Sequence, residues 1–451
     1  MKAQHKTSYN LLMSKNQTLI ARSLHAVWHP CTQMKHHEHF PLIPIVRGEG
    51  VWLYDADGKR YLDTVSSWWV NLFGHNHPGI KEAIKQQLDT LEHVMLAGFT
   101  HEPVVALSEQ LAKLTGLGHA FYASDGASAT EIALKMSFHY WRNTGHAKKT
   151  KFISLQHSYH GETLGALGVT DVAIFKDTYA PLLLQSAQMP SPDFRLAEQG
   201  ENAEQFALRC ACALETYIAA HHDELAAFII EPLVQCAGGM GFYHPVYLKR
   251  AREICTQYQV HLIADEIAVG FGRTGKMFAC EHAAPHVSDI ADFVCLSKGI
   301  TGGYLPLSVV LTKDEIYQAF YDDRTVRGFL HSHSYTGNPL ACSAALATLA
   351  IFEQAQVLHH NQNISKNIQT SMQVLTHLPI QHLRHQGMIH AFDVQTNNAQ
   401  FSRDCYANGL AKGLLLRPIG NTVYFMPPYV INEEDIDWMV KQTALVVQQS
   451  L

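Results

Sequence analysis

The chain has 451 residues, of which 47% are hydrophobic, and its 34 Lys and Arg against 40 Asp and Glu give a formal net charge of −6. This length suits two domains or one large domain with appendages, and the composition supplies a sizeable apolar core. A slightly acidic chain without a basic stripe argues against nucleic acid or an anionic membrane surface as a partner.

Cysteine usage and the N-terminal residues predict a reduced, cytoplasmic protein. Residues 1–20 hold no continuous apolar stretch and no small-residue cleavage site, so we expect no secretory signal. No run approaches about 18 uninterrupted apolar residues, so we expect no membrane span. The nine cysteines are scattered and form no C-x-x-C pair, a pattern typical of cytosolic proteins. The stretch "KHHEHF" matches no common zinc spacing, and we expect a solvated loop and no metal there.

The first predicted strands lie near the N-terminus, where residues 45–63 read as a hairpin around the turn-forming "DADG". Through the middle of the chain, short apolar runs alternate with longer amphipathic stretches such as "CALETYIAAHHDEL" and "PVYLKRAREICTQY". The apolar runs read as buried strands: "HAFYAS", "KFISLQ", "LAAFIIEPL", "VHLIADE", "DFVCLS" and "LPLSVVLT". This alternation predicts an α/β domain with a largely parallel sheet, covered on both faces, whose ligand binds at the carboxyl ends of the strands.

The C-terminal part reads differently from the middle. After about residue 340 come a helix, mixed strands around "IHAFDV" and "TVYFMPP", and a final amphipathic helix. We therefore expect a large central domain over residues 76–340. A smaller α+β domain would be built from both chain ends, residues 1–75 and 341–451.

Two side chains that could take part in a chemical reaction follow predicted strands. Asp265 ends "VHLIADE", and Lys298 follows "DFVCLS" in the glycine-bearing "SKGITGG". The interval suits a strand, a crossover and a neighbouring strand, so both residues could face one crevice. A lysine amine can form a Schiff base with an aldehyde cofactor, and a carboxylate can pair with a pyridinium nitrogen. A structural ion pair or a surface lysine would explain the same two residues about as often.

Two loops could bind a phosphate. In "FYASDGASATE" a small-residue turn, Ser124 to Ser128, precedes a helix expected to begin near Thr130, and free N–H groups at a helix start attract anions. An ordinary capped helix is the alternative. The loop "HSHSYTGNP" adds the hydroxyls of Ser334 and Thr336, again with a purely structural reading open.

Aromatic and cationic residues provide further candidates. Tyr159 and His160 follow "KFISLQ", where an aromatic ring could stack on a flat cofactor or cap the sheet. Arg417 follows an apolar run, and a planar guanidinium suits a substrate carboxylate. Trp68 and Trp69 could form an apolar wall of a binding site or pack in the core.

Taken together, these stretches resemble the class III, fold-type I aminotransferases that use pyridoxal 5′-phosphate. The run from "LIADEIAVGFGRTG" through "DFVCLSKGITGG" is similar to the family's cofactor-attachment signature, and the likeness extends from about Trp28 to the C-terminus. It implies that Lys298 holds the cofactor and moves the proton, that Asp265 pairs with the pyridine nitrogen, and that Gly126 and Ala127 form the phosphate-binding turn.

The resemblance also implies partners and substrate contacts. His333 and Ser334 match a loop that reaches the phosphate from the neighbouring subunit of a homodimer, which would place the active site at the subunit interface. Tyr159, with Trp68, Ser332 and Arg417, falls where the family contacts cofactor or substrate, and Arg417 would hold a substrate carboxylate.

Within the family, "WHPCTQM", "SSWWVNLFGHNHP", "SYHGET" and "RPIGNTVYFMPPY" resemble the members that aminate 8-amino-7-oxononanoate to 7,8-diaminononanoate in biotin biosynthesis. This implies S-adenosyl-L-methionine as amino donor, although "HSHSYTGN" and "KGITGGYLP" are similar to a branch that uses lysine. Three positions depart from the common pattern: Cys31 replaces a substrate-selecting tyrosine, Glu162 replaces an aspartate, and Ala127 offers the phosphate only its backbone N–H. A transaminase for ornithine or 4-aminobutyrate is the alternative enzyme, and a non-catalytic binding protein on this fold is the alternative of another class.

Overall fold

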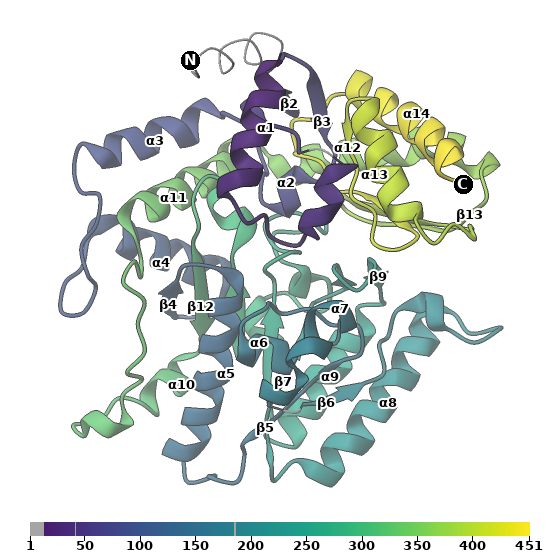
Figure 1. The fold of residues 1–451 in the computed structure, drawn as a ribbon. Coiled ribbons are helices and arrows are strands. Elements are labelled where there is room, and N and C mark those ends of the chain that lie inside the picture. Colours follow the sequence, from purple (N-terminus) through teal and green to yellow (C-terminus); the bar gives the residue numbers. More distant parts are fainter. Residues whose placement is uncertain (1–12, 41, 185) are drawn as a thin grey trace, which may run out of the picture.

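The computed structural model describes residues 13–40, 42–184 and 186–451. A seven-stranded sheet forms the centre of the lower part in Figure 1, in the order β4-β12-β11-β10-β7-β5-β6. Neighbouring strands are parallel except where β12 lies antiparallel to β11 and β4. The strands are β4 (His119–Ala123), β5 (Lys151–Leu155), β6 (Ala187–Met189), β7 (Leu225–Ile230), β10 (His261–Asp265), β11 (Phe293–Leu296) and β12 (Ser308–Thr312). The prediction of a largely parallel sheet is therefore confirmed.

Both faces of this sheet are covered, which explains why its strands are continuous apolar runs. Alternate residues of one strand enter two different clusters: Ile229 packs with α5 on one face, and Phe228 joins the larger core on the other. The larger core includes buried residues of α4, α8 and α9. The helices and the small hairpin of this part are α4 (Glu102–Thr115), α5 (Gly126–Asn143), α6 (Leu164–Gly168), α7 (Ala173–Lys176), α8 (Ala203–His221), α9 (Val246–Gln257), α10 (Asp314–Gln318), β8 (Val234–Gln235) and β9 (Gly241–Phe242).

The upper part in Figure 1 is built from the first and the last described segments of the chain. The predicted hairpin around "DADG" is present as β2 and β3, and β3 also pairs in parallel with β15, so that Leu62 lies opposite Leu414. One small sheet has the order β1-β2-β3-β15 and another β13-β14-β16. The strands are β1 (Ile45–Glu49), β2 (Trp52–Asp55), β3 (Arg60–Asp63), β13 (Ile380–Gln386), β14 (Ile389–Val394), β15 (Leu414–Leu415) and β16 (Thr422–Phe425). The domain boundaries at residues 75/76 and 340/341 stay a prediction.

Helices complete the upper part. They are α1 (Lys15–Ala26), α2 (Ser66–Trp69), α3 (Pro78–Leu88), α11 (Pro339–Gln354), α12 (Val357–Met372), α13 (Phe401–Ala411) and α14 (Glu433–Ser450). Among the described residues, no single helix has the length and apolar character needed to cross a membrane. Two consecutive helical segments, Pro339–Gln354 and Val357–His377, are together long and apolar enough to span a membrane by length and composition alone, but they are bent by 75° relative to each other.

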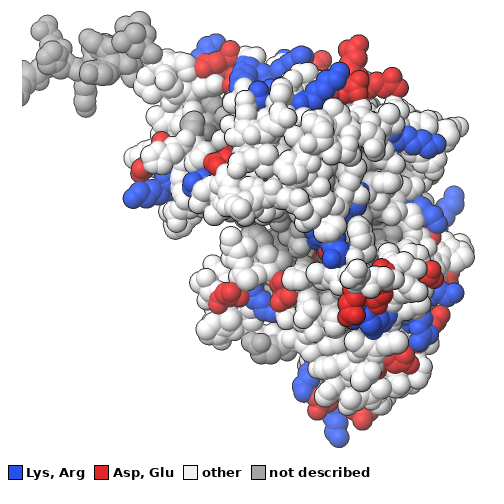
Figure 2. All heavy atoms as spheres, turned by 90° about the vertical axis from the view of Figure 1, so that its right-hand side faces the viewer, with Lys and Arg blue, Asp and Glu red and all other residues white. Residues whose placement is uncertain are grey.

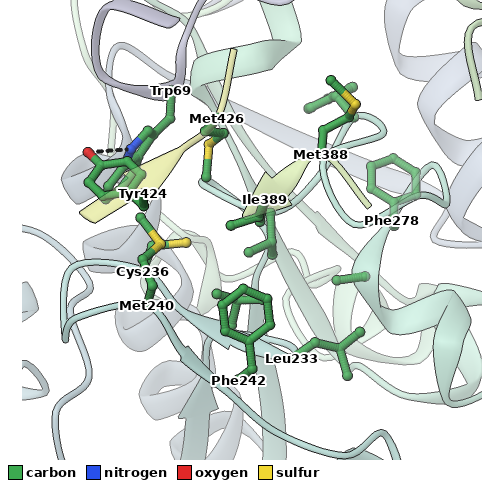
Figure 3. Packing of buried hydrophobic residues seen from close by; sticks show 14 of the residues in the cluster. Trp69, Leu233, Cys236, Met240, Phe242, Phe278, Met388, Ile389, Tyr424 and Met426 are labelled. Atoms are coloured by element: carbon green, nitrogen blue, oxygen red, sulfur yellow. Dashed lines mark hydrogen bonds between the residues drawn. The ribbon is translucent and has the colours of Figure 1, made fainter. Parts of the chain in front are cut away.

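A common core joins the two parts. Figure 3 shows Met388 and Ile389 of the upper part on the side of Phe278 and Phe242 of the lower part, and all four belong to one buried cluster. On the face shown in Figure 2, acidic and basic side chains are interspersed, and the surface is hollowed between the two parts. The carboxyl ends of the central strands face this junction, which is where the sequence predicted a ligand.

Candidate active site

The central sheet brings together Asp265 and Lys298, the two residues predicted to take part in the chemistry. In the parallel ladder of β10 and β11, Asp265 is the partner of Cys295, so Lys298 follows closely at the same edge of the sheet. Asp265 and Lys298 both line one cavity of about 550 Å³. The crevice expected from their spacing is therefore present.

Lys298 lies in an unusual position for a lysine. Its backbone has a φ of +46°, two residues after the end of the buried strand β11. Its side chain is partly open to the cavity, and the amine lies 5.3 Å from the centre of the Trp69 ring. Burial lowers the pKa of this amine, against the opposing effect of Asp265. An amine with a lowered pKa is a neutral proton acceptor at a lower pH than an exposed lysine.

Asp265 is held by two donors. His160 Nδ1 donates to Asp265 Oδ2 at 2.7 Å, and the backbone N–H of Ile267 donates to Oδ1 at 3.1 Å. The other ring nitrogen of His160 is buried and has no hydrogen-bond partner among the described residues. Sequence reasoning placed His160 at the end of a strand but did not connect it with Asp265.

Glu231 is a residue of the cavity that sequence reasoning missed. It follows β7, is buried, and accepts hydrogen bonds from the backbone N–H groups of Tyr159 (3.0 Å) and Cys236 (3.1 Å). Burial raises the pKa of Glu231 to about 7, although His160 acts in the opposite direction. Its position directly after an apolar strand was the available signal, the same one that identified Asp265.

Tyr159 and Glu162 form one wall. The Tyr159 hydroxyl donates to Glu162 Oε1 at 3.0 Å, and its ring packs edge-on against Phe175. Burial, followed by the charge of Glu162, raises the pKa of Tyr159 above its ordinary value, so the phenol stays protonated and can donate.

The turn predicted to bind the phosphate forms the start of α5. The helix begins at Gly126 and not near Thr130, because Asp125 caps it by accepting hydrogen bonds from the Ser128 N–H and hydroxyl, both at 2.9 Å. Gly-Ala-Ser is thus the first helical turn instead of a loop before it. No described hydrogen bond involves the N–H groups of Gly126 and Ala127, and both residues line the cavity. Two free N–H groups at the start of an 18-residue helix suit a phosphate.

A second cavity of about 1040 Å³ adjoins the first and contains three of the predicted substrate residues, Cys31, Trp68 and Arg417. The guanidinium of Arg417 lies 4.8 Å from the centre of the Trp68 ring. Among the described residues, no hydrogen bond or ion pair involves Arg417. Cys31 lines the same cavity, and burial and then Glu162 raise the pKa of its thiol, while Arg417 lowers it.

Three predicted residues lie outside both cavities within this chain. Ser332 and Ser334 are exposed, and His333 bonds with His331, whose other ring nitrogen lies 2.8 Å from Lys135 Nζ on α5. One chain therefore does not bring these residues to Lys298.

The cavity has the features that pyridoxal phosphate requires. Lys298 offers an amine for the aldehyde, Asp265 a carboxylate for the pyridine nitrogen, and the start of α5 two free N–H groups for the phosphate. Gly161 allows close packing at this turn, because a Cβ on it would lie 2.5 Å from the Cβ of Ala127. The residues present fit this cofactor.

The sheet, with a lysine and an aspartate at its carboxyl edge, defines a fold-type I pyridoxal phosphate-dependent enzyme. Residues 33–447 match the model of the family described as aminotransferase class-III. The chain belongs to the class III aminotransferases, which use pyridoxal phosphate.

Individual relatives agree with this family. The chain is 48% identical to the adenosylmethionine-8-amino-7-oxononanoate aminotransferase of Helicobacter pylori, over 94% of this chain and 96% of that protein. It is 37% identical to the protein of the same name from Staphylococcus aureus, over 95% and 97% of the two chains. The crystal structure of the protein of that name from Methanocaldococcus jannaschii has a TM-score of 0.89 at 35% identity, covering 96% and 98%. An omega transaminase of Pseudomonas jessenii in complex with PMP has a TM-score of 0.90 at 26% identity, covering 96% and 98%.

Proposed function

We propose that this aminotransferase converts 8-amino-7-oxononanoate to 7,8-diaminononanoate in biotin biosynthesis, with S-adenosyl-L-methionine as amino donor. The relatives named for this substrate pair match nearly the whole chain. The observation that carries the proposal is the unpaired guanidinium of Arg417, which lies at the cavity adjoining Lys298 and Asp265. A keto acid of this kind carries a carboxylate far from its reacting carbon, as that arrangement requires.

Lys298 would be the general acid and base of both half-reactions. Bound pyridoxal phosphate supplies an electron sink that stabilises negative charge at the substrate carbon. The amine of Lys298 takes a proton from one atom and returns it to another, which needs a pKa closer to neutrality than that of a free lysine. The burial that lowers the pKa of this amine supports that role.

Asp265 would hold the proton on the pyridine nitrogen, with His160 as its positioning residue. The 2.7 Å hydrogen bond from His160 fixes one carboxylate oxygen, and the Ile267 N–H fixes the other. The buried Glu231 holds the backbone of Tyr159, and so places the aromatic ring at the cavity.

Arg417 and Trp68 would bind the substrate. A guanidinium donates two parallel hydrogen bonds to a carboxylate, and the indole shields the pair from water. Tyr159 and Glu162 offer a hydroxyl and a carboxylate to an amino group at the opposite wall. The cavity of about 1040 Å³ leaves room for a donor as large as an adenosyl group.

The donor is tested by the visible absorption of the purified protein. We expect the cofactor band to fade when S-adenosyl-L-methionine is added and to return with 8-amino-7-oxononanoate, with 7,8-diaminononanoate detected by mass spectrometry. Fading with lysine alone would assign the enzyme to the lysine-using branch. Fading only with ornithine or 4-aminobutyrate would replace the proposed reaction, and a protein that stays colourless with added cofactor would be non-catalytic.

We also propose that the active enzyme is a homodimer in which His333, Ser334 and Ser332 reach the partner's cavity. Exposed large apolar side chains support this, because the segment that carries these residues and the loop between α3 and α4 present several of them: Met95, Phe99, Val326, Leu330 and Tyr335.

Subunit complementation tests this arrangement. Lys298→Ala and Ser334→Glu chains are each expected to be inactive, the second because it places a negative charge beside a phosphate. Mixed and refolded together, they would regain up to about a quarter of the sites, since one site of a mixed dimer has both residues intact. No regain of activity, with mixed dimers shown by mass, would contradict a shared site.

The location is proposed to be the cytoplasm, as expected from the sequence. All nine cysteines are free, which suits a reducing compartment. Small-molecule substrates are the partners that this site accounts for.

A further inference from the structure

The segment Ser66–Trp69 has a backbone conformation that its sequence does not favour. All four residues have a positive φ, at +51°, +47°, +74° and +72°, although none is Gly or Asn. Left-handed conformation is sterically disfavoured for L-residues and occurs mostly at single positions. A turn of four such residues therefore has to be held by its surroundings.

Asp63 holds the middle of the turn through hydrogen bonds to Ser67. It is fully buried, its Oδ1 accepts the Ser67 N–H at 2.8 Å, and its Oδ2 accepts the Ser67 hydroxyl at 2.7 Å. His75 Nε2 donates to the same Oδ2 at 2.9 Å, which fixes the carboxylate. Both oxygens of Asp63 are thus directed at the residue in the middle of the strained segment.

Residues from the C-terminal part of the chain hold the two ends of the turn. The Ser66 hydroxyl donates to the carbonyl of Met426 at 2.8 Å, and Trp69 Nε1 donates to the Tyr424 hydroxyl at 3.1 Å. Of these two contacts, Figure 3 draws the one between Trp69 and Tyr424. Both contacts fix the ends of the turn, whereas Asp63 fixes its centre.

The turn has a consequence for the cavity. Adjacent residues of a strand point to opposite sides, but Trp68 and Trp69 both line the second cavity, the one of about 1040 Å³. The Trp69 ring lies 5.3 Å from Lys298 Nζ, and the Trp68 ring lies 4.8 Å from the guanidinium of Arg417. One left-handed turn thereby supplies an aromatic neighbour to each of the two cationic groups.

We propose that Asp63 is a positioning residue of the reaction, which holds the left-handed turn so that Trp69 covers the amine of Lys298 and Trp68 supports Arg417. The inference rests on the roles given to Lys298 and Arg417 under the proposed function. Asp63 lines neither of the two cavities.

The test uses Asp63→Ala alone and together with Ser67→Gly. Glycine enters the left-handed region without steric cost, so it should restore the turn when the carboxylate is absent. We expect Asp63→Ala to lower kcat/KM at least tenfold, with effects on both kcat and the KM of the keto acid, and the double variant to recover at least threefold. The matched control is Asp55→Ala, which removes a buried carboxylate of the same small sheet that contacts Asn16 and Tyr61 instead of the turn. It should leave kcat/KM close to that of the parent.

A second readout needs no turnover. In the cofactor-free chain, brief treatment with acetic anhydride and peptide mass analysis measure the accessibility of Lys298. We expect labelling at least threefold faster in Asp63→Ala and near the parent rate in the double variant. Because this labelling involves no substrate, it also distinguishes failure of the inference from failure of the proposed reaction.

Full activity of Asp63→Ala would overturn the inference. So would a loss that Ser67→Gly does not relieve while Lys298 labelling is unchanged, because Asp63 would then be only structural. If Asp63→Ala does not fold, Ser67→Ala removes a single hydrogen bond to the same carboxylate. It should then show a smaller loss in kcat/KM and a smaller gain in labelling, and unchanged values for both would contradict the inference.

Discussion

At the scale of single residues, the site is a set of buried polar groups whose partners come from distant parts of the chain. His160 and Asp265 are 105 positions apart and meet at 2.7 Å. Lys298 could be identified from the sequence because its strand and that of Asp265 are neighbours with a readable interval. The partnership of His160 could not be, because β7 lies between β5 and β10, and this order is not apparent in the residues themselves.

Replacement of Lys298 by Ala should abolish turnover without unfolding the protein. The side chain is partly open to a cavity, so its loss leaves no new enclosed void. We expect kcat to fall at least about a hundredfold, the usual loss when a general acid–base group is removed. Steady-state rates and thermal melting measure both effects, and Lys276→Ala, on the surface, serves as the control. Retained turnover would remove Lys298 from the mechanism.

Replacement of Arg417 by Ala should weaken binding of the keto acid. Removing a charge-assisted carboxylate partner costs about 2 kcal/mol, which raises KM for 8-amino-7-oxononanoate roughly thirtyfold. Arg60 is the matched control, because its guanidinium also stacks on an indole, that of Trp52 at 4.1 Å. Arg60→Ala should leave KM unchanged, and equal effects of the two variants would argue against carboxylate binding by Arg417.

At the scale of elements, burial decided what could be predicted. Six strands of the central sheet were visible as apolar runs because residues on both of their faces are buried. The three-residue β6 at the sheet edge is only partly buried and gave no such signal. The left-handed turn was also invisible, because Ser-Ser-Trp-Trp contains neither Gly nor Asn, and tertiary contacts impose its conformation.

The close contact between Gly161 and the start of α5 gives a testable prediction. A Cβ at Gly161 would lie 2.5 Å from the Cβ and 2.8 Å from the Cα of Ala127, so Gly161→Ala must displace the turn that would bind the phosphate. We expect at least about tenfold weaker binding of pyridoxal phosphate, or 1.4 kcal/mol, measured by absorbance titration of the cofactor-free protein.

Gly145→Ala is the control for backbone strain. Gly145 also has a positive φ, +87°, but nothing lies within 4 Å of the Cβ that Ala would add. It should lose some thermal stability and keep its cofactor affinity. If both variants bind the cofactor as the parent does, the Gly161 contact does not shape the phosphate site.

At the scale of the whole molecule, the upper and lower parts are joined by a buried ionic network as well as by apolar packing. Asp393 on β14 accepts hydrogen bonds from Arg384 (2.9 Å) and Thr422 (2.8 Å), and Arg195 of the lower part pairs with it at 3.2 Å. Burial opposes the ionisation of Asp393, but the charge of Arg384 and the hydrogen bonds to Asp393 outweigh this and lower the pKa of Asp393 below its ordinary value.

Asp393→Asn should therefore destabilise the protein in a pH-dependent way. It leaves the buried Arg384 without its carboxylate partner, whereas the partly buried Arg195 keeps Asp193, and we expect a cost of about 3 kcal/mol in the free energy of unfolding at pH 7. Because the pKa is lower in the folded state, this stability is present above about pH 4 and is lost as the pH falls through the folded-state pKa. Urea denaturation from pH 8 to pH 3 should show a constant difference that shrinks at the acidic end.

A carboxylate at the surface, Asp322, offers a control for the loss of charge alone. Asp322 also contacts two arginines, Arg324 and Arg327, but at the surface, where such pairs contribute little. Asp322→Asn should leave the unfolding midpoint nearly unchanged. An equal loss in both variants would show that the network does not join the two parts.

The pairing of the chain ends also sets an order of events during synthesis. The hydroxyl of Ser66 donates to the carbonyl of Met426, which lies 360 residues later in the chain. A ribosome therefore synthesises Met426 on the order of 20 to 70 seconds after Ser66. β3 pairs with β2 early but lacks its second neighbour until β15 has emerged. A nascent chain released before residue 426 would carry Lys298 and Asp265 and yet have no anchored wall facing them.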